Sequence, residues 1–178
     1  MRIRSLIAAA FLLVSFAAAQ TEPKPRPEVP YEPTENAVVQ AMLDLAGVKS
    51  TDVVYDLGCG DGRIVVLAAQ SYGARGVGVD IDPERIRDAR ANAQRNAVEN
   101  LVRFEVKDLF DTDIHEATVV TLYLLPAVNL RLRPKLLKDL KPGTRIVSHS
   151  FDMGDWKPEK EEVVEGQRLY LWTVPQKK

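Results

Sequence analysis

A turn with three alternating glycines, DLGCGDGR at positions 56–63, follows directly on an apolar run. Backbone in such a turn can approach a ligand closely, and a glycine-rich turn between a strand and a helix usually binds phosphate. Here Asp56 and Asp61 place negative charge on the turn, and Asp61 stands where its carboxylate would cap the helix N–H groups that phosphate needs. The residue types therefore favour a ligand that has a positive centre and no phosphate.

Two further aspartates follow later apolar runs. Asp80 comes 22 residues after Gly58, where a carboxylate can accept hydrogen bonds from both hydroxyls of a ribose. Asp108 is placed to accept from an adenine amino group, and Leu109 to pack on the ring. Each aspartate alone fits an ordinary turn or helix cap. Their order after successive strands predicts S-adenosylmethionine, which carries a sulfonium, an ammonium and an adenosine.

The elements that must position these residues alternate along the chain. Apolar runs typical of strands lie at 52–57, 74–82, 101–106, 117–125 and 144–149. Helical patterns lie at 34–47, 61–73, 83–98 and 128–143, the last with Pro134 near its start. Two strand-like runs hinged at Glu165-Gly166 predict a hairpin. The pattern predicts an α/β, Rossmann-like, seven-stranded and mostly parallel sheet, with helices on both faces and a C-terminal antiparallel hairpin.

The first thirty residues differ in character from the rest. Two arginines, an uncharged apolar run and three alanines predict a signal peptide over residues 1–19. Prolines are dense in the linker predicted over residues 20–30, so the folded domain is expected to span residues 31–178. Cys59 is the single cysteine, which excludes an internal disulfide. With 24 basic and 25 acidic side chains, the chain has no basic field, and nucleic-acid binding is not expected.

The segments DLGCGDGR, GVDID and KDLF resemble the cofactor motifs of class I S-adenosylmethionine-dependent methyltransferases. VPYEPT, TLYLLP and FDMGDWKP extend the resemblance to the small protein lysine methyltransferases of archaea and, more distantly, of mitochondria. The similarity covers about residues 28 to 175. The resemblance implies that Asp56, Gly58 and Gly60 hold the methionine end of the cofactor. It also implies that Asp80 binds the ribose and that Asp108 and Leu109 bind the adenine. Tyr31 and Thr34 would fold over the cofactor near its carboxylate.

The methyl acceptor is expected to lie near Tyr123, because the segment after the fourth strand lines that end of the site. Enzymes that methylate nucleic-acid adenine or glutamine carry Asn or Asp and two prolines there, whereas this chain reads YLLP. A lysine ammonium must lose a proton before it attacks, and an aromatic, partly dry channel favours the neutral amine. We expect Tyr123 and His149 to act in catalysis, and Phe151 and Trp156 to bind the substrate by cation–π contact. Tyr123 and Trp156 equally fit ordinary packing roles.

Three functions remain open on the sequence. The first is methyl transfer to lysine side chains of proteins by a monomer without a metal site, a nucleic-acid partner or stable membrane insertion. The second is N- or O-methylation of a small molecule, which the short chain disfavours because it has no inserted cap. The third is a non-catalytic exported module that keeps the fold. A functional leader predicts a periplasmic or secreted protein, although S-adenosylmethionine is made in the cytosol. If the leader is not functional, we expect a cytoplasmic enzyme.

Overall fold

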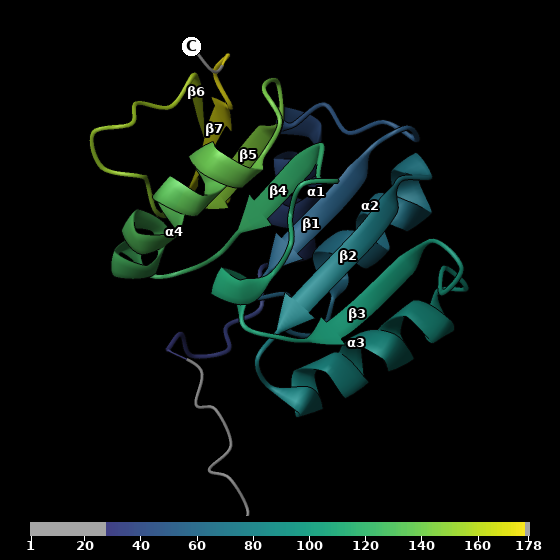
Figure 1. The fold of residues 1–178 in the computed structure, drawn as a ribbon. Helices are drawn as coiled ribbons and strands as arrows, with labels where there is room; N and C mark the ends of the chain where they lie inside the picture. The colour runs from purple at the N-terminus through teal and green to yellow at the C-terminus, as the bar shows by residue number, and fades with distance from the viewer. Residues whose placement is uncertain (1–27, 177–178) are drawn as a thin grey trace, which may run out of the picture.

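The computed structural model describes residues 28–176 (Figure 1). The predicted signal peptide and most of the predicted linker lie outside these residues. The helices are α1 (Asn36–Leu45), α2 (Arg63–Tyr72), α3 (Pro83–Arg95), the short 3₁₀ helix η1 (Leu109–Asp111) and α4 (Pro126–Asp139). The strands are β1 (Val53–Leu57), β2 (Arg75–Asp80), β3 (Val102–Val106), β4 (Val119–Leu122), β5 (Arg145–His149), β6 (Lys160–Val164) and β7 (Gln167–Thr173).

The seven strands of residues 28–176 form one sheet in the order β3-β2-β1-β4-β5-β7-β6. Pairing is parallel from β3 through β5, and β7 runs antiparallel to both β5 and β6. The chain order reverses between β1 and β4, so the carboxyl ends of these strands border the crevice where ligands bind in doubly wound sheets. The expected fold class, including the antiparallel hairpin, is confirmed.

Each face of the sheet buries its own apolar cluster. The first cluster joins α1, α2 and α3 to one face, and the second joins α4 to the other (Figure 1). Consecutive side chains of a strand point to opposite faces, so Val54 belongs to the first cluster while Val53 and Tyr55 belong to the second. Buried parallel strands of this kind read as continuous apolar runs, as they do here. No helix within residues 28–176 combines the length and apolar character that crossing a bilayer requires.

The boundaries around the fourth strand differ from the expected ones. The apolar run predicts a strand over 117–125, but β4 pairs only over Val119–Leu122. Leu125 is extended because the residue before a proline avoids the helical region, and Pro126 then opens α4 in its first turn. Pro134 therefore lies inside α4 rather than near its start, which costs one backbone hydrogen bond. Buried Leu132 and Leu136, on either side of it, keep the helix packed on the sheet.

Candidate active site

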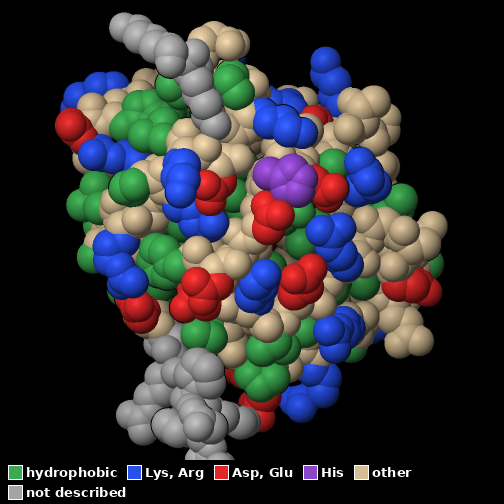
Figure 2. Space-filling model, in the orientation of Figure 1, with side chains coloured by type: hydrophobic (Ala, Val, Ile, Leu, Met, Phe, Trp, Pro, Cys, Tyr) green, Lys and Arg blue, Asp and Glu red, His purple; other side chains and the backbone are tan. Residues whose placement is uncertain are grey.

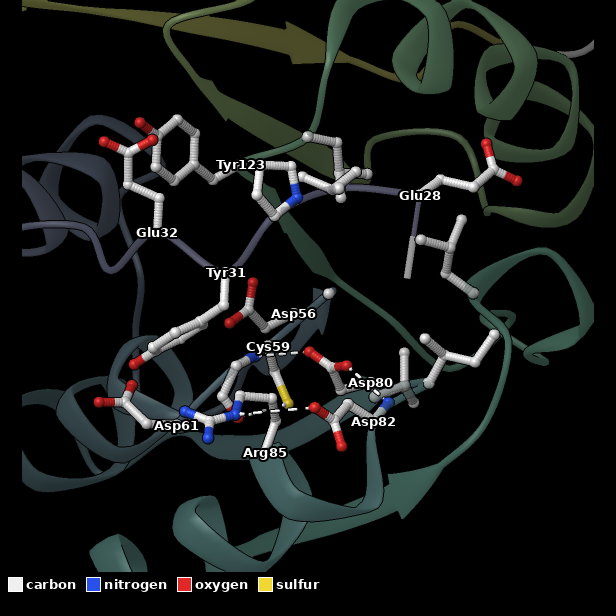
Figure 3. Close-up of a pocket in the computed structure, with 18 of the residues that line it drawn as sticks. Glu28, Tyr31, Glu32, Asp56, Cys59, Asp61, Asp80, Asp82, Arg85 and Tyr123 are labelled. Carbon is white, nitrogen blue, oxygen red and sulfur yellow. Dashed lines mark hydrogen bonds and ion pairs between the residues drawn. The ribbon is translucent and has the colours of Figure 1, made fainter. Parts of the chain in front are cut away.

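A cleft opens at the carboxyl ends of β1, β2 and β4, beneath the segment that precedes α1 (Figure 3). We call this segment, residues 28–35, the N-terminal strap. The space in the cleft, including its open mouth, is about 1090 Å³. The cleft is lined by nine of the residues that the sequence predicts for the site: Tyr31, Thr34, Asp56, Gly58, Gly60, Asp80, Asp108, Leu109 and Tyr123. The structure therefore brings all eight expected cofactor residues together with Tyr123.

Asp56 lies on β1 at the floor of the cleft, where its side chain is almost wholly buried. Thr121 of β4 donates a hydrogen bond from Oγ1 to Asp56 Oδ1 at 2.8 Å. Burial raises the pKa of Asp56 to about 7; the bond from Thr121 opposes this rise, and the charges of Asp80 and Asp61 add to it. Among residues 28–176 no cation pairs with Asp56. A positively charged ligand beside it would relieve this burial of charge.

The glycine-rich turn uses its own amides inside the protein. The N–H groups of Gly58 and Cys59 both donate to the carbonyl of Val79 at 2.9 Å. Gly60 N donates to Asp80 Oδ2 at 2.9 Å and thereby joins the turn to the end of β2. A phosphate in this turn would have to compete for these donors. The observed hydrogen bonds therefore support the prediction of a ligand without phosphate.

Asp61 caps the helix differently from the expectation. The helix α2 begins at Arg63, and its N-cap is Gly62, whose φ is +73° and which has no side chain to cap with. Asp61 still accepts from the N–H of Arg63 at 3.3 Å, and it pairs with the Arg63 guanidinium at 2.9 and 2.7 Å. This pairing lowers the pKa of Asp61 although burial opposes it. The turn is thus less negative than the sequence suggests.

Asp80 and Asp108 mark the far end of the cleft. Asp80 Oδ1 accepts from the N–H of Asp82 at 2.9 Å, and Asp108 Oδ1 accepts from the N–H of Phe110 at 2.8 Å. Each carboxylate keeps further acceptor sites, because a carboxylate has about four lone-pair positions. Leu109 and Phe110 line the cleft beside Asp108. The predicted ribose and adenine roles are compatible with this geometry.

The N-terminal strap is tied to three parts of the domain. Glu28 pairs with Arg131 of α4 at 2.6 Å, and the Arg85 guanidinium lies over the Tyr31 ring, 4.6 Å from its centroid. Thr34 is buried, and its carbonyl accepts from Arg63 Nη1 at 2.8 Å. No sequence pattern indicated this role for Arg85 or Arg131, because both belong to patterns typical of solvated helix faces.

Tyr123 and His149 form a stacked pair at the end of the cleft nearest β5. Their ring centroids are 3.9 Å apart, with 30° between the ring planes. His149 is buried, and its Nδ1 lies 3.1 Å from Thr34 Oγ1, while Nε2 has no hydrogen-bond partner among residues 28–176. Burial lowers the pKa of His149, so that its neutral form is favoured at pH 7. His149 does not line the cleft itself; it supports the residue that does.

Phe151 and Trp156 lie apart from the cleft lining. The Trp156 ring packs near Trp172, with 6.0 Å between centroids, and its carbonyl accepts from Trp172 Nε1 at 2.8 Å. Phe151 is half-buried, and Asn129 of α4 donates to its carbonyl at 3.2 Å. The structure thus places Trp156 against the core of the second cluster. Direct substrate binding by either residue stays a prediction.

Comparison with known proteins identifies the family. A sequence model described as the ANTKMT methyltransferase domain matches residues 56–160, more than half of the chain. The chain belongs to this methyltransferase family. The methyltransferase is 47% identical to a protein-lysine N-methyltransferase of Saccharolobus islandicus, over 85% of this chain and 98% of that protein. It is 35% identical to the mouse adenine nucleotide translocase lysine N-methyltransferase, over 75% of this chain and 58% of that longer protein.

A solved structure supplies the cofactor. It is the crystal structure of a protein described as an RNA methyltransferase from Salinibacter ruber, in complex with S-adenosyl-L-homocysteine. The two chains are 56% identical, with a TM-score of 0.81 over 83% of this chain and 96% of that one. S-adenosylmethionine is therefore the methyl donor of this methyltransferase. The cleft fits it, because no cation of residues 28–176 pairs with buried Asp56 and the turn amides are already bonded within the protein.

Proposed function

We propose that the methyltransferase transfers the methyl group of S-adenosylmethionine to the side-chain nitrogen of lysine residues in proteins. The observation that carries this proposal is the match to the Saccharolobus lysine N-methyltransferase, which extends over 98% of that protein. A match of this extent leaves little of that enzyme without a counterpart here. Membership of the family also favours an enzyme over a non-catalytic module that keeps the fold.

The cofactor would lie along the cleft in the direction that the carboxylates mark. We assign its methionine end to Asp56, Gly58 and Gly60, which meet at the end of β1. The ribose would lie at Asp80 and the adenine at Asp108, beside Leu109 and below the strap residues Tyr31 and Thr34. When bound, S-adenosylmethionine supplies a methyl group that its sulfonium has already activated. The protein then has to position an acceptor and exclude water.

Tyr123 and His149 suit the acceptor end for a physical reason. A lysine attacks only as the neutral amine, and its ordinary pKa is about 10.4. The aromatic face of Tyr123 provides a partly dry surface that favours the neutral form. His149, which burial keeps neutral, holds this tyrosine by ring stacking. Thr34 links this pair to the strap through its contact with His149. The strap that would cover the cofactor and the aromatic surface that would face the acceptor are therefore in direct contact.

RNA is the second candidate acceptor, because the Salinibacter protein is described as an RNA methyltransferase. The charges described here favour protein instead. On α4, Arg131 pairs with Glu28, Arg133 with Asp155, and Lys135 with Asp139. Basic and acidic side chains are interspersed over the face shown in Figure 2. Paired cations release little counterion on binding a phosphate backbone, and counterion release supplies much of RNA affinity.

Transfer of labelled methyl groups tests the proposal. The full chain is incubated with labelled S-adenosylmethionine and an unstructured peptide that contains several lysines, or its twin with every lysine replaced by arginine. A third reaction contains an unstructured RNA. We expect label in the lysine peptide alone, and none with the Asp80→Ala variant. Label in the RNA and none in the peptide would overturn the proposal in favour of the second candidate.

A further inference from the structure

The acidic side chains of the cleft differ in whether the protein supplies a partner. Six of the seven accept hydrogen bonds or form ion pairs within residues 28–176: Glu28, Asp56, Asp61, Asp80, Asp82 and Asp108. Glu32 is the exception among the described residues. It lines the cleft and is exposed, yet no donor of residues 28–176 bonds to its carboxylate. A negative charge at this place has room for a positively charged ligand.

Glu32 faces the acceptor side of the cleft rather than the cofactor side. Figure 3 shows its carboxylate beside the Tyr123 ring, whereas Asp80 and Asp82 lie with Arg85 across the cleft. Burial raises the pKa of Tyr123, and the negative charge of Glu32 raises it further. Burial lowers the pKa of His149, and the charge of Glu32 opposes this decrease. Both effects require Glu32 to be near the stacked pair. The charge is therefore where an incoming acceptor would pass.

The strap holds Glu32 in place. Pro33 follows it directly, and the residue before a proline is restricted to extended backbone. Thr34 comes next and is buried, with its hydroxyl against His149 and its carbonyl bonded to Arg63. A side chain so placed loses little backbone freedom when it binds a ligand. Its position is fixed even though its carboxylate is exposed.

We infer that Glu32 binds the side-chain ammonium of the target lysine at the exposed mouth of the cleft. The lysine then gives its proton to solvent and passes Tyr123 into the cleft as the neutral amine. This inference rests on the proposed function and names the residue that would select a cationic acceptor. An ammonium has three N–H donors and a full positive charge. The carboxylate can accept hydrogen bonds from these donors and attracts the charge. A neutral hydroxyl or amide acceptor would gain no such attraction. Glu32 thus acts in substrate binding, at a different place from the cofactor carboxylates.

The experiment compares Glu32→Gln with Glu35→Gln in the full chain. Glu35 is a matched control, because it is exposed in the same strap and does not line the cleft. Steady-state kinetics give KM and kcat for the lysine peptide, and calorimetry gives the affinity for S-adenosylmethionine. For Glu32→Gln we expect a KM about fivefold higher, with kcat and cofactor affinity unchanged. The KM difference should shrink as ionic strength rises from about 0.05 M to about 0.5 M, because salt screens the attraction.

The outcomes separate this inference from the proposed function. If the wild-type chain methylates no lysine peptide, the proposed function fails and the inference falls with it. If the wild-type chain does methylate the peptide and Glu32→Gln has an unchanged KM, the inference alone is overturned. A loss of cofactor affinity in Glu32→Gln as large as the rise in KM would also overturn it, because Glu32 would then serve the cofactor. A rise in KM in Glu35→Gln of the same size would reduce the effect to general surface charge.

Discussion

Replacing Asp56 by Asn removes the most costly buried charge of the cleft and should stabilise the protein. Burial raises the pKa of Asp56 from its ordinary 3.8 to about 7, so the folded state holds a proton that the unfolded chain has released. Folding is therefore less favourable as pH rises from about 4 to 7. The full rise corresponds to about 4 kcal/mol of unfolding free energy. Asn carries no charge at any pH and preserves an oxygen for the hydroxyl of Thr121.

Urea denaturation of both proteins at pH 4 and pH 8, without cofactor, measures this effect. At pH 8 we expect Asp56→Asn to exceed the wild type by about 4 kcal/mol, and at pH 4 by less than about 1 kcal/mol. Its affinity for S-adenosylmethionine should fall in the same preparation, because the charge that complements the cofactor's cation is lost. A stability difference that does not change between the two pH values would refute the reasoning. Asp56 would then have the same pKa in the folded and the unfolded state.

Three further outcomes are expected. Asp80→Ala should lose calorimetric binding of S-adenosylmethionine, while the wild type binds it and does not bind a nicotinamide dinucleotide; wild-type binding of the dinucleotide would contradict the cofactor assignment. Gly60→Ala should lower the unfolding free energy by about 1 kcal/mol or more and weaken cofactor binding, because φ is +52° there and a Cβ would lie 2.5 Å from a Tyr31 ring carbon. An Ala variant with wild-type stability and affinity would show that the turn is less constrained. Mass spectrometry of the protein isolated from its cells should find Gln20 as the first residue if residues 1–19 are a cleaved leader, and Met1 if they are not.

The sequence was most informative where position in a strand fixes position in space. Asp56 and Asp80 lie at the ends of β1 and β2, and Asp108 comes just after β3. Parallel strands end at one edge of a sheet, so the convergence of these residues was predictable. The conformation of the glycine-rich turn was predictable for a local reason, because its backbone has positive φ at positions where glycine is favoured. The end of β4 was not predictable, since an apolar run continues past the last paired residue and does not show where pairing stops.

Longer-range packing accounts for the rest. Trp156 contacts Trp172 across 16 residues of sequence, and no local pattern distinguishes that packing from an aromatic substrate channel. Glu32 was missed because it lies in irregular chain, where neither periodicity nor a strand end gives its direction. Its significance came from a comparison of partners within residues 28–176, where the other carboxylates of the cleft have a partner and Glu32 has none. Such a comparison requires the folded arrangement.

The N-terminal strap joins the beginning of the chain to its later half. Glu28 meets Arg131 across 103 residues, and Thr34 meets His149 across 115 residues. During synthesis, the strap leaves the ribosome shortly before its nearer partners Arg63 and Arg85 and long before Arg131 and His149, so its contacts are complete only when β5 has emerged. A growing chain therefore forms the glycine-rich turn and the first strands before the strap fully covers the cleft. S-adenosylmethionine can then stabilise the completed fold by binding to it, because only a chain translated nearly to its end can enclose the cofactor.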